Sequence, residues 1–515
     1  MGGSGYHRLI SMGGRQAAIS TRRMAAVANE ENSNRSRRAT GQAGSLHHKK
    51  CPPALRYAGA AITLAHRHGR VRLRKIFAWT KVMNDFMGQH HSVLISGAAV
   101  LVDACNLIPN GAVAIANGLI QACGGRAQLR RKFPDFSEIR VAHSVLTPGF
   151  INAHSHLELT FLAGKIPGPT DFPTWVVQLL NSYPEAAESP HIFAASARLG
   201  AQESLRFGVT TVGDITRQHA VVRPVLQGQS PLRLVSFGEI TALGRTRQYL
   251  ARRLAEALDF QPTRPDFTIG LSPHAPYSVE GPALKKIAAA ARKRRLPLCM
   301  HLAELREEKE FLADFSGPLG VNWPLMQHLQ ILDAKVPRFA KGPILWAAHY
   351  GLFGREAPVM LAHVNYADDA ELDILARSGA AVAYCPRTRH YFGHDDVTPH
   401  RWREMLARGM TVCLATDSKA SNPDLSVLRE AQFLKLREPQ SDPQQLLAMI
   451  TTQPAAALGL SHHLGRLAPG FAADILAMPV PAPCAGSAAS VAEYLIEHAP
   501  LPQQIWMAGQ ALSAL

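Results

Sequence analysis

The chain has 515 residues, 47% hydrophobic and 18% charged, with a formal net charge of +16, which suits a folded protein of two or three domains. No run approaches the ~20 continuous apolar residues of a membrane-spanning helix, which argues against an integral membrane protein. Seven scattered cysteines without a CxxC pair argue against a disulfide framework or a cysteine-rich zinc site, and they favour a reducing cytoplasm.

The positive charge belongs to the first 88 residues. They hold 16 Lys and Arg against three acids, whereas the rest of the chain holds 39 against 36. A basic arm can bind phosphate backbones, but this one has no interleaved aromatic residues and no nucleic-acid-reading motif, so a nucleic-acid partner is not expected. We place residues 1–88 outside the fold, as a disordered leader, a targeting segment or an upstream start with Met83 or Met87 as the true one.

Residues 89–146 alternate short apolar segments with turns, as in SVLISGAAVLV, which indicates a small β-sheet unit. After Leu146, apolar runs of strand length alternate with segments of helical periodicity, the pattern of βα units and a parallel sheet. The eight runs are TPGFINAHSH (147–156), GVTTVGDI (208–215), LRLVSFGEIT (232–241), FTIGLSPHAP (267–276), LPLCMHLAE (296–304), VMLAHVN (359–365), AAVAYCP (380–386) and MTVCLATDS (410–418). Eight strands in this order predict a closed (β/α)8 TIM barrel.

The predicted helices between these runs include 190–207, 281–295, 368–378 and 399–408, and residues 424–460 are expected to form terminal helices. Residues 461–515 then return to short β segments. The predicted architecture is a barrel over residues 147–460 with a small β-sandwich domain built from residues 89–146 and 461–515.

Several predicted strands end on ionisable residues, at the edge where such barrels place their active sites. His154 and His156 are two residues apart on the first strand and so point to the same face. With 23 histidines in the chain this pair alone is weak evidence, and residues 66–68 repeat the spacing outside any strand. The pair gains weight from His301 at the end of the fifth strand and Asp417 at the end of the eighth.

Three imidazole nitrogens and a carboxylate oxygen suit zinc or ferrous iron. Each residue has a simpler interpretation, since a histidine at a strand end can be a hydrogen-bonded structural residue and Asp417 can cap the helix that follows. Four such coincidences at four appropriate strand ends are improbable, so the sequence favours a metal site.

The segments LTPGFINAHSHLELT, HLAE, LAHVN, TDSKASNPD and GRLAPGFAADI resemble the signatures of the amidohydrolase superfamily, in order, from about residue 92 to 510. Within it, the chain is similar to the branch of cytosine, guanine and S-adenosylhomocysteine deaminases and chlorohydrolases. HLEL and CPRTRHYFGH are most similar to aminodeoxyfutalosine deaminase-like members. The resemblance implies a hydrolase of carbon–nitrogen bonds other than peptide bonds, most directly a deaminase of an amino-substituted purine-like ring or its nucleoside.

The resemblance also implies roles for particular residues. The metal ligands would be His154, His156, His301 and Asp417. Glu304 would be the proton shuttle, His363 would orient the water and the departing group, and Asp417 would accept the second proton. The alternative for Glu304 is a solvated helix start, because LAELREEKE is rich in charge.

One metal ion is expected, zinc with iron as the alternative. Binuclear members of the superfamily bridge two ions with a carboxylated lysine on the fourth strand, and FTIGLSPHAP contains no lysine.

Four residues are candidate substrate contacts. By resemblance, His274 faces the reacting ring or its amino group. Glu158 accepts hydrogen bonds from a base or ribose, or forms a structural salt bridge. Trp175 stacks on a purine or packs in the core, and Arg387 binds a substrate carboxylate or is solvated.

Two further features bear on the substrate. The extra cations Arg389 and Lys419 favour an anionic substrate. The stretch of about 55 residues after Glu304, with Trp323 and Trp346, is long for a βα connection and predicts a lid or substrate-reading insert.

Two rival functions remain open at this point. One is hydrolysis of chloride or a substituted amine from a heteroaromatic ring by the same site, because the residues that activate water do not distinguish the leaving group. The other, of a different class, is a nucleic-acid-associated protein with an inactive barrel. We expect a small-molecule substrate, no membrane association and a cytoplasmic location, and the sequence leaves a homo-oligomer open.

Overall fold

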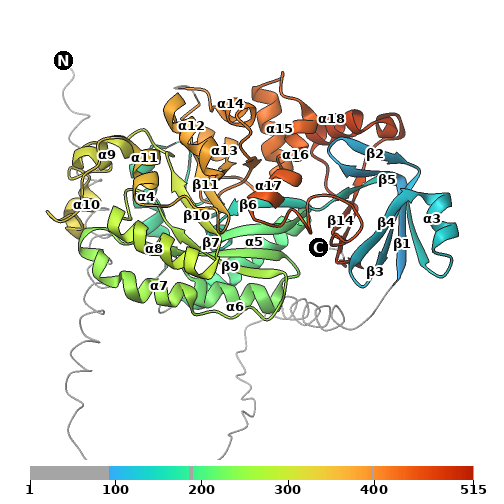
Figure 1. The fold of residues 1–515 in the computed structure, drawn as a ribbon, viewed down its shortest axis with the longest axis horizontal. Coiled ribbons are helices and arrows are strands. Elements are labelled where there is room, and N and C mark those ends of the chain that lie inside the picture. Colours follow the sequence, from blue (N-terminus) through green and yellow to red (C-terminus); the bar gives the residue numbers. More distant parts are fainter. Residues whose placement is uncertain (1–91, 169, 185–188, 396–397, 514–515) are drawn as a thin grey trace, which may run out of the picture. The chain divides into compact units, whose positions relative to one another are not determined.

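The computed structural model describes residues 92–168, 170–184, 189–395 and 398–513, so the predictions for residues 1–88 lie outside the described part. Eight parallel strands form one sheet in sequential order, flanked by helices (Figure 1). They are β6 (Phe150–Ser155), β7 (Val209–Thr216), β8 (Arg233–Ile240), β9 (Phe267–Pro273), β10 (Leu298–Leu302), β11 (Val359–His363), β12 (Ala381–Tyr384) and β13 (Val412–Leu414). The predicted (β/α)8 barrel is confirmed.

The barrel closes between its first strand and the segment that follows its last. Ser155 forms a parallel bridge with Asp417, and the Asp417 amide donates to the His154 carbonyl at 3.2 Å. Backbone pairing across this seam therefore fixes the distance between the first-strand histidines and Asp417.

Helices connect successive strands, and several have clear sequence signals. α5 (Pro190–Arg206) and α8 (Gly281–Arg294) carry proline in the first turn, and α12 (Asp369–Ser378) starts with a reciprocal capping box from Asp368 and ends at Gly379 with φ +73°. The other helices on the barrel's flanks are α6 (His219–Gln229), α7 (Leu250–Leu258), α11 (Pro343–His349), α14 (Trp402–Ala407), α15 (Val427–Arg437), α16 (Pro443–Ala448) and α17 (Thr452–Ala457).

One predicted helix starts later than expected. The sequence predicts a helix over 399–408, but α14 begins at Trp402. His400 is instead buried before the helix, where its Nε2 lies 3.0 Å from the His363 carbonyl and its ring stacks on Tyr384.

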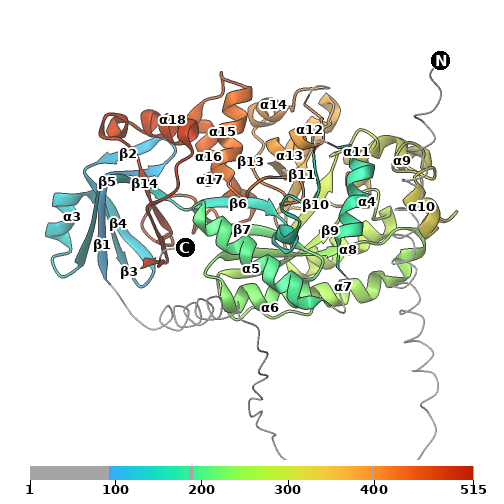
Figure 2. The same cartoon turned by 180° about the vertical axis from the view of Figure 1, so that it is seen from behind.

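The smaller domain is an eight-stranded mixed sheet built from both ends of the fold. Its strands are β1 (Val93–Asp103), β2 (Asn106–Pro109), β3 (Gly111–Ala116), β4 (Leu119–Gly125), β5 (Ser137–Pro148), β14 (Ile475–Pro479), β15 (Gln504–Met507) and β16 (Gln510–Ala511). The late strand β14 pairs antiparallel with the early strand β5, as the blue and red ribbons in Figure 2 show. Because of this pairing, β5 extends to Pro148 and includes the first two residues of the segment that was predicted to be the first barrel strand.

An apolar cluster joins five of the loops that follow barrel strands, and we call it the lid cluster. Its members come from α4 (Phe172–Ser182), α9 (Glu308–Asp314), α10 (Pro324–Leu329) and neighbouring loops, and they include Phe172, Leu243, Tyr277, Phe311, Trp323 and Phe392. Trp323 thus belongs to the lid cluster, whereas Trp346 is buried in α11 against Tyr350. In the described ranges no helix is long and apolar enough to cross a membrane.

Candidate metal centre

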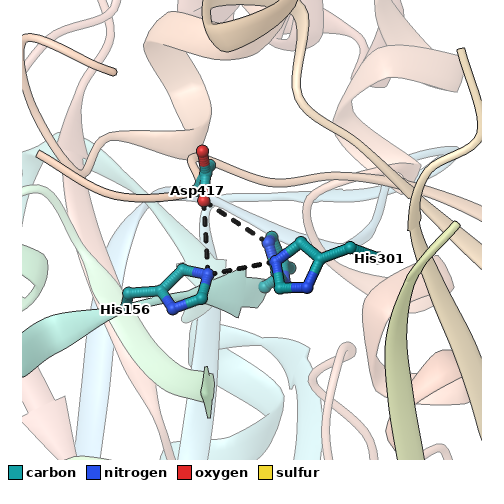
Figure 3. A group of neighbouring side chains, drawn as sticks. His156, His301 and Asp417 are labelled. Atoms are coloured by element: carbon teal, nitrogen blue, oxygen red, sulfur yellow. Dashed lines mark hydrogen bonds and ion pairs between the residues drawn. The ribbon is translucent and has the colours of Figure 1, made fainter. Parts of the chain in front are cut away.

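Four predicted ligands meet at the carboxyl ends of three strands (Figure 3). His154 lies on β6 and His156 directly follows it, His301 lies on β10, and Asp417 follows β13. Asp417 Oδ1 lies 3.5 Å from His154 Nε2 and 3.4 Å from His156 Nε2, and the Nε2 atoms of His156 and His301 are 3.3 Å apart. All four residues are buried, and their ligand atoms lie within 4.8 Å of one another.

The three ligand imidazoles are buried and neutral, and His301 presents an unprotonated Nε2 to the cluster. Burial lowers the pKa of His154 and His156 well below the ordinary value and that of His301 to about 4, so all three are neutral near pH 7. His301 donates from Nδ1 to the His274 carbonyl at 3.1 Å, which fixes the tautomer with a free Nε2. His154 Nε2 has no hydrogen-bond partner although it is buried.

This arrangement fits a divalent ion. Lone pairs at 3.3 Å repel, and a buried unpaired nitrogen is costly, unless a cation lies between them. Nitrogen ligands about 2.0–2.1 Å from a tetrahedral zinc ion lie about 3.3–3.4 Å from one another, close to the three separations of 3.3, 3.4 and 3.5 Å given above. Among the described residues this is the only group of three or more histidine, cysteine or acidic side chains arranged to hold a metal.

Second contacts orient Asp417. Ser421 Oγ donates to Asp417 Oδ2 at 2.8 Å, and Ser155 Oγ donates to the Asp417 carbonyl at 3.0 Å. The Asp417 backbone has φ +56°, and His363 at the end of β11 has φ +73°. Left-handed backbone at non-glycine residues is costly, and here it turns the chain so that both side chains lie over the barrel end.

Glu304 lies beside this cluster in a buried setting. Its Oε1 is 3.5 Å from His363 Nε2, and its Oε2 is 3.5 Å from the Tyr277 hydroxyl. Burial, together with the negative charges of Asp417 and Glu308, raises the pKa of Glu304 well above its ordinary value. Glu304 is therefore a buried carboxyl and not a solvated helix residue.

Glu308 was not singled out from the sequence, yet it holds the Glu304 segment in place. Its fully buried carboxylate accepts the amide hydrogens of Ala303, Glu304 and Leu305 at 2.9, 2.8 and 3.1 Å. Burial raises the pKa of Glu308 to about 8, against the lowering effect of these amides. The available signal was an acid at the first position of α9, where a carboxylate can accept free amides.

His274 follows β9 and faces the cluster. Its ring centroid is 5.0 Å from that of His301, and its Nδ1 lies 2.7 Å from Ser278 Oγ. Burial lowers the pKa of His274 to about 4, so its ring is neutral near pH 7.

The carboxylate of Glu158 is hydrogen-bonded to other groups of the protein. Its carboxylate accepts hydrogen bonds from Thr216 Oγ1 at 2.5 Å, the amides of Gln218 and Arg217 at 2.9 and 3.1 Å, and the Tyr183 hydroxyl at 3.2 Å. These four contacts tie the loop after β6 to the end of β7, and they leave little capacity for a substrate.

The indole ring of Trp175, on α4, is fixed by a hydrogen bond and by aromatic packing. Nε1 donates to the Ala420 carbonyl at 3.1 Å, and the ring packs against Phe172 and Phe392 of the lid cluster. The residue therefore sits within the loops over the barrel, where packing already accounts for much of its surface.

Arg387 forms ion pairs inside the fold, whereas the sequence left open a substrate carboxylate or solvent as its partner. Its guanidinium donates to Glu430 at 2.7 Å and to Asp424 at 2.9 Å. Arg389 donates to the backbone carbonyls of His394 and Thr398. Since these charges are already engaged, they give an anionic substrate no support.

Lys419 is engaged in the same way. Its Nζ lies 2.7 Å from Glu203 and donates to the Pro423 carbonyl at 2.6 Å. The second cation that favoured an anionic substrate is therefore also neutralised within the fold.

A parallel (β/α)8 barrel with three neutral imidazoles and a carboxylate at its strand ends defines a metal-dependent barrel enzyme. The model of the Amidohydrolase family matches residues 145–494, and that of an imidazolonepropionase-like composite domain of bacteria matches residues 111–135. The chain belongs to the amidohydrolase family and is a hydrolase.

Similar proteins include several deaminases. A 5-methylthioadenosine/S-adenosylhomocysteine deaminase of Nitratidesulfovibrio vulgaris is 30% identical over 416 residues, covering 76% of this chain and 84% of the relative. An aminodeoxyfutalosine deaminase of Deinococcus radiodurans is 29% identical, covering 65% and 78%. The crystal structure of an adenosine deaminase of Xanthomonas campestris with bound zinc superposes with a TM-score of 0.66 at 22% identity, covering 82% and 92%.

Proposed function

We propose that this protein is a hydrolytic deaminase that replaces the exocyclic amino group of an adenine-type nucleoside with oxygen. The observation that carries this proposal is the juxtaposition of the four-residue metal cluster with Glu304, a buried carboxyl whose pKa is raised and whose Oε1 is 3.5 Å from His363 Nε2. Relatives named for deamination of methylthioadenosine, S-adenosylhomocysteine and aminodeoxyfutalosine support the substrate class.

The proposed cofactor is one zinc ion held by His154, His156, His301 and Asp417, with ferrous iron as the alternative. The absence of lysine from β9 supports a single ion, and the zinc in a similar structure supports its identity. When bound, such an ion lowers the pKa of water toward ~7 and supplies hydroxide near neutral pH.

The chain's own residues would then move the protons. Glu304 takes one proton of the attacking water and delivers it to the ring nitrogen next to the reacting carbon. Asp417 passes the second proton to the departing amino group, with His363 orienting that group. Oxygen becomes bonded to the ring carbon, the carbon–nitrogen bond breaks, and ammonia leaves.

The remaining predicted contacts would hold the ring. We propose that His274 faces the amino group of the substrate. We also propose that Trp175, whose indole N–H is bonded to the Ala420 carbonyl, forms one wall of the site for the base, beneath the lid cluster. Arg387 and Glu158 are positioning residues in this proposal, because their polar atoms are already bonded within the fold.

The test is ammonia release from a panel of adenosine, 5′-methylthioadenosine, S-adenosylhomocysteine and adenine, with chloro- and alkylamino-triazines as the rival substrates. Release from the nucleosides supports the proposal. Turnover of the triazines alone would favour the rival leaving groups, and no ammonia from any nucleoside would contradict deamination.

A small-molecule substrate and a cytoplasmic location are part of the proposal. The rival with an inactive barrel conflicts with the intact set of four ligands and Glu304. A chain lacking residues 1–88 should keep full activity, and loss of activity or salt-sensitive DNA binding by the full chain would favour that rival.

A further inference from the structure

The turn after β11 carries His363 in a backbone conformation that non-glycine residues rarely adopt. His363 has φ +73°, and the next residue, Val364, has φ +47°. Left-handed backbone is costly for any residue with a side chain, and most of all for a β-branched one such as valine. Such a turn persists only where neighbouring groups hold it, so those groups decide where the His363 imidazole points.

One side of this turn is bonded to the segment that carries Glu304. The Val364 amide donates to the Leu302 carbonyl at 3.2 Å. The side-chain amide of Asn365 donates from Nδ2 to the Glu304 carbonyl at 3.1 Å. These two bonds fix the turn beside β10 and the Glu304 backbone.

The other side of the turn is held by a side chain. The paired register of β11 with β12 ends at Ala362 and Ala383, one residue before His363. His400 Nε2 lies 3.0 Å from the His363 carbonyl oxygen. Because a carbonyl only accepts hydrogen bonds, Nε2 carries the hydrogen and donates it. His400 thus bonds the turn where the pairing of the two strands has ended.

His400 is itself fixed for this contact. It is buried, and its ring stacks on that of Tyr384 with centroids 3.7 Å apart and planes 10° apart. Burial lowers the pKa of His400 to about 3, so the ring is neutral near pH 7. Its Nδ1 has no hydrogen-bond partner among the described residues. An apolar ring would avoid the cost of that unpaired nitrogen, so stacking on Tyr384 alone does not explain a histidine at this position.

The bond from His400 bears on the reacting groups through His363. The His363 Nε2 atom lies 3.5 Å from Glu304 Oε1, and its ring centroid lies 5.5 Å from those of His154 and His301. A rotation of the peptide after His363 would move this imidazole relative to all three. A displacement of about 1 Å in such a group can lower a rate by about 100-fold.

We propose that His400 is a positioning residue, which holds the turn after β11 and so directs the His363 imidazole toward Glu304 and the metal cluster. The catalytic part of this inference rests on the proposed function. His400 acts through the His363 carbonyl and carries no proton in the reaction.

The experiment compares two amide variants, His400→Gln and His400→Asn. Glutamine places an N–H where the imidazole has Nε2, whereas the asparagine amide ends where the imidazole has Nδ1, short of the His363 carbonyl. His400→Leu removes the donor altogether. The control is Met405→Ala, which opens a cavity beside α14 and leaves residue 400 unchanged.

The kinetic readout uses the nucleoside that releases ammonia fastest. His400→Asn and His400→Leu should lower kcat by about 10- to 100-fold, with KM and metal content as in wild type, whereas His400→Gln should stay within about threefold of wild type. Met405→Ala should lower the midpoint of thermal unfolding and keep kcat. Equal kcat values in His400→Gln and His400→Asn would overturn the positioning role, and this comparison decides even where His400→Leu does not fold.

Crystal structures of the two amide variants test the inference without turnover. The His363 ring should stay beside Glu304 in His400→Gln and turn away from it in His400→Asn. An unmoved His363 in His400→Asn would overturn the inference and leave deamination standing. A wild type that releases no ammonia from any nucleoside would overturn the proposed function, and the two structures would still decide whether His400 directs His363.

Discussion

Buried polar side chains in two regions of this molecule differ in their partners. Beside the small domain, Asp474 accepts two hydrogen bonds from Arg233, at 2.5 and 3.0 Å, and one from the Ala508 amide at 2.9 Å. At the barrel end, the buried His154 Nε2 has no hydrogen-bond partner among the described residues. Since an unpaired buried polar group costs free energy, the Asp474 carboxylate is satisfied by the protein, whereas the histidine cluster is arranged to receive a ligand.

The largest effect is expected from His301→Ala. Removing one of three imidazoles should abolish tight metal binding and, with it, several kcal/mol of transition-state stabilisation, which lowers kcat/KM by about 10³-fold or more. Metal analysis and steady-state kinetics measure both quantities. Retention of one ion per chain with full activity would show that the cluster is not the metal site.

Glu304→Gln should separate chemistry from binding. The amide keeps the shape of the side chain but cannot carry the proton, so kcat should fall by about 10²- to 10⁴-fold while metal content stays at the wild-type level. Metal loss equal to that of His301→Ala would show that Glu304 is a ligand and not the proton shuttle.

Glu308→Gln should have a smaller effect and shift a pH profile. The Glu308 charge raises the pKa of Glu304, so its removal should lower that pKa. Glu304 must be unprotonated to take the proton of the attacking water, so a lower pKa should move the acidic limb of the kcat profile to lower pH. The free energy of unfolding should also fall by about 1–3 kcal/mol, because three amides lose part of their acceptor. A stability loss with an unmoved profile would reduce Glu308 to a structural residue.

Asp474→Asn tests the other region and should leave chemistry unchanged. Breaking its buried pair with Arg233 should cost about 3–5 kcal/mol of unfolding free energy, measured by denaturant titration. The kcat of the folded fraction should match wild type. A fall in kcat comparable to that of Glu304→Gln would contradict the claim that the Asp474 ion pair contributes to stability and not to catalysis.

Periodicity was enough to predict the barrel, because its strands are short apolar runs separated by helices. The metal ligands could also be predicted from the sequence, since the two-residue spacing of His154 and His156 fixes their common direction. The sequence could not show which hydrogen-bond and ion-pair partners each polar side chain finds in the folded protein. Glu158 meets Thr216 58 residues away, and Arg387 meets Glu430 43 residues away. A free carboxylate and a saturated one look alike until the fold brings their donors together.

The central claim is that the cluster at the barrel end holds a catalytic metal ion. The most direct measurement is elemental analysis of the purified chain together with ammonia release from adenosine derivatives, before chelation, after chelation and after addition of one equivalent of zinc. We predict about one ion per chain, activity that disappears with the ion, and recovery on zinc addition in wild type but not in His301→Ala. A metal-free chain that still releases ammonia at the wild-type rate would contradict the account.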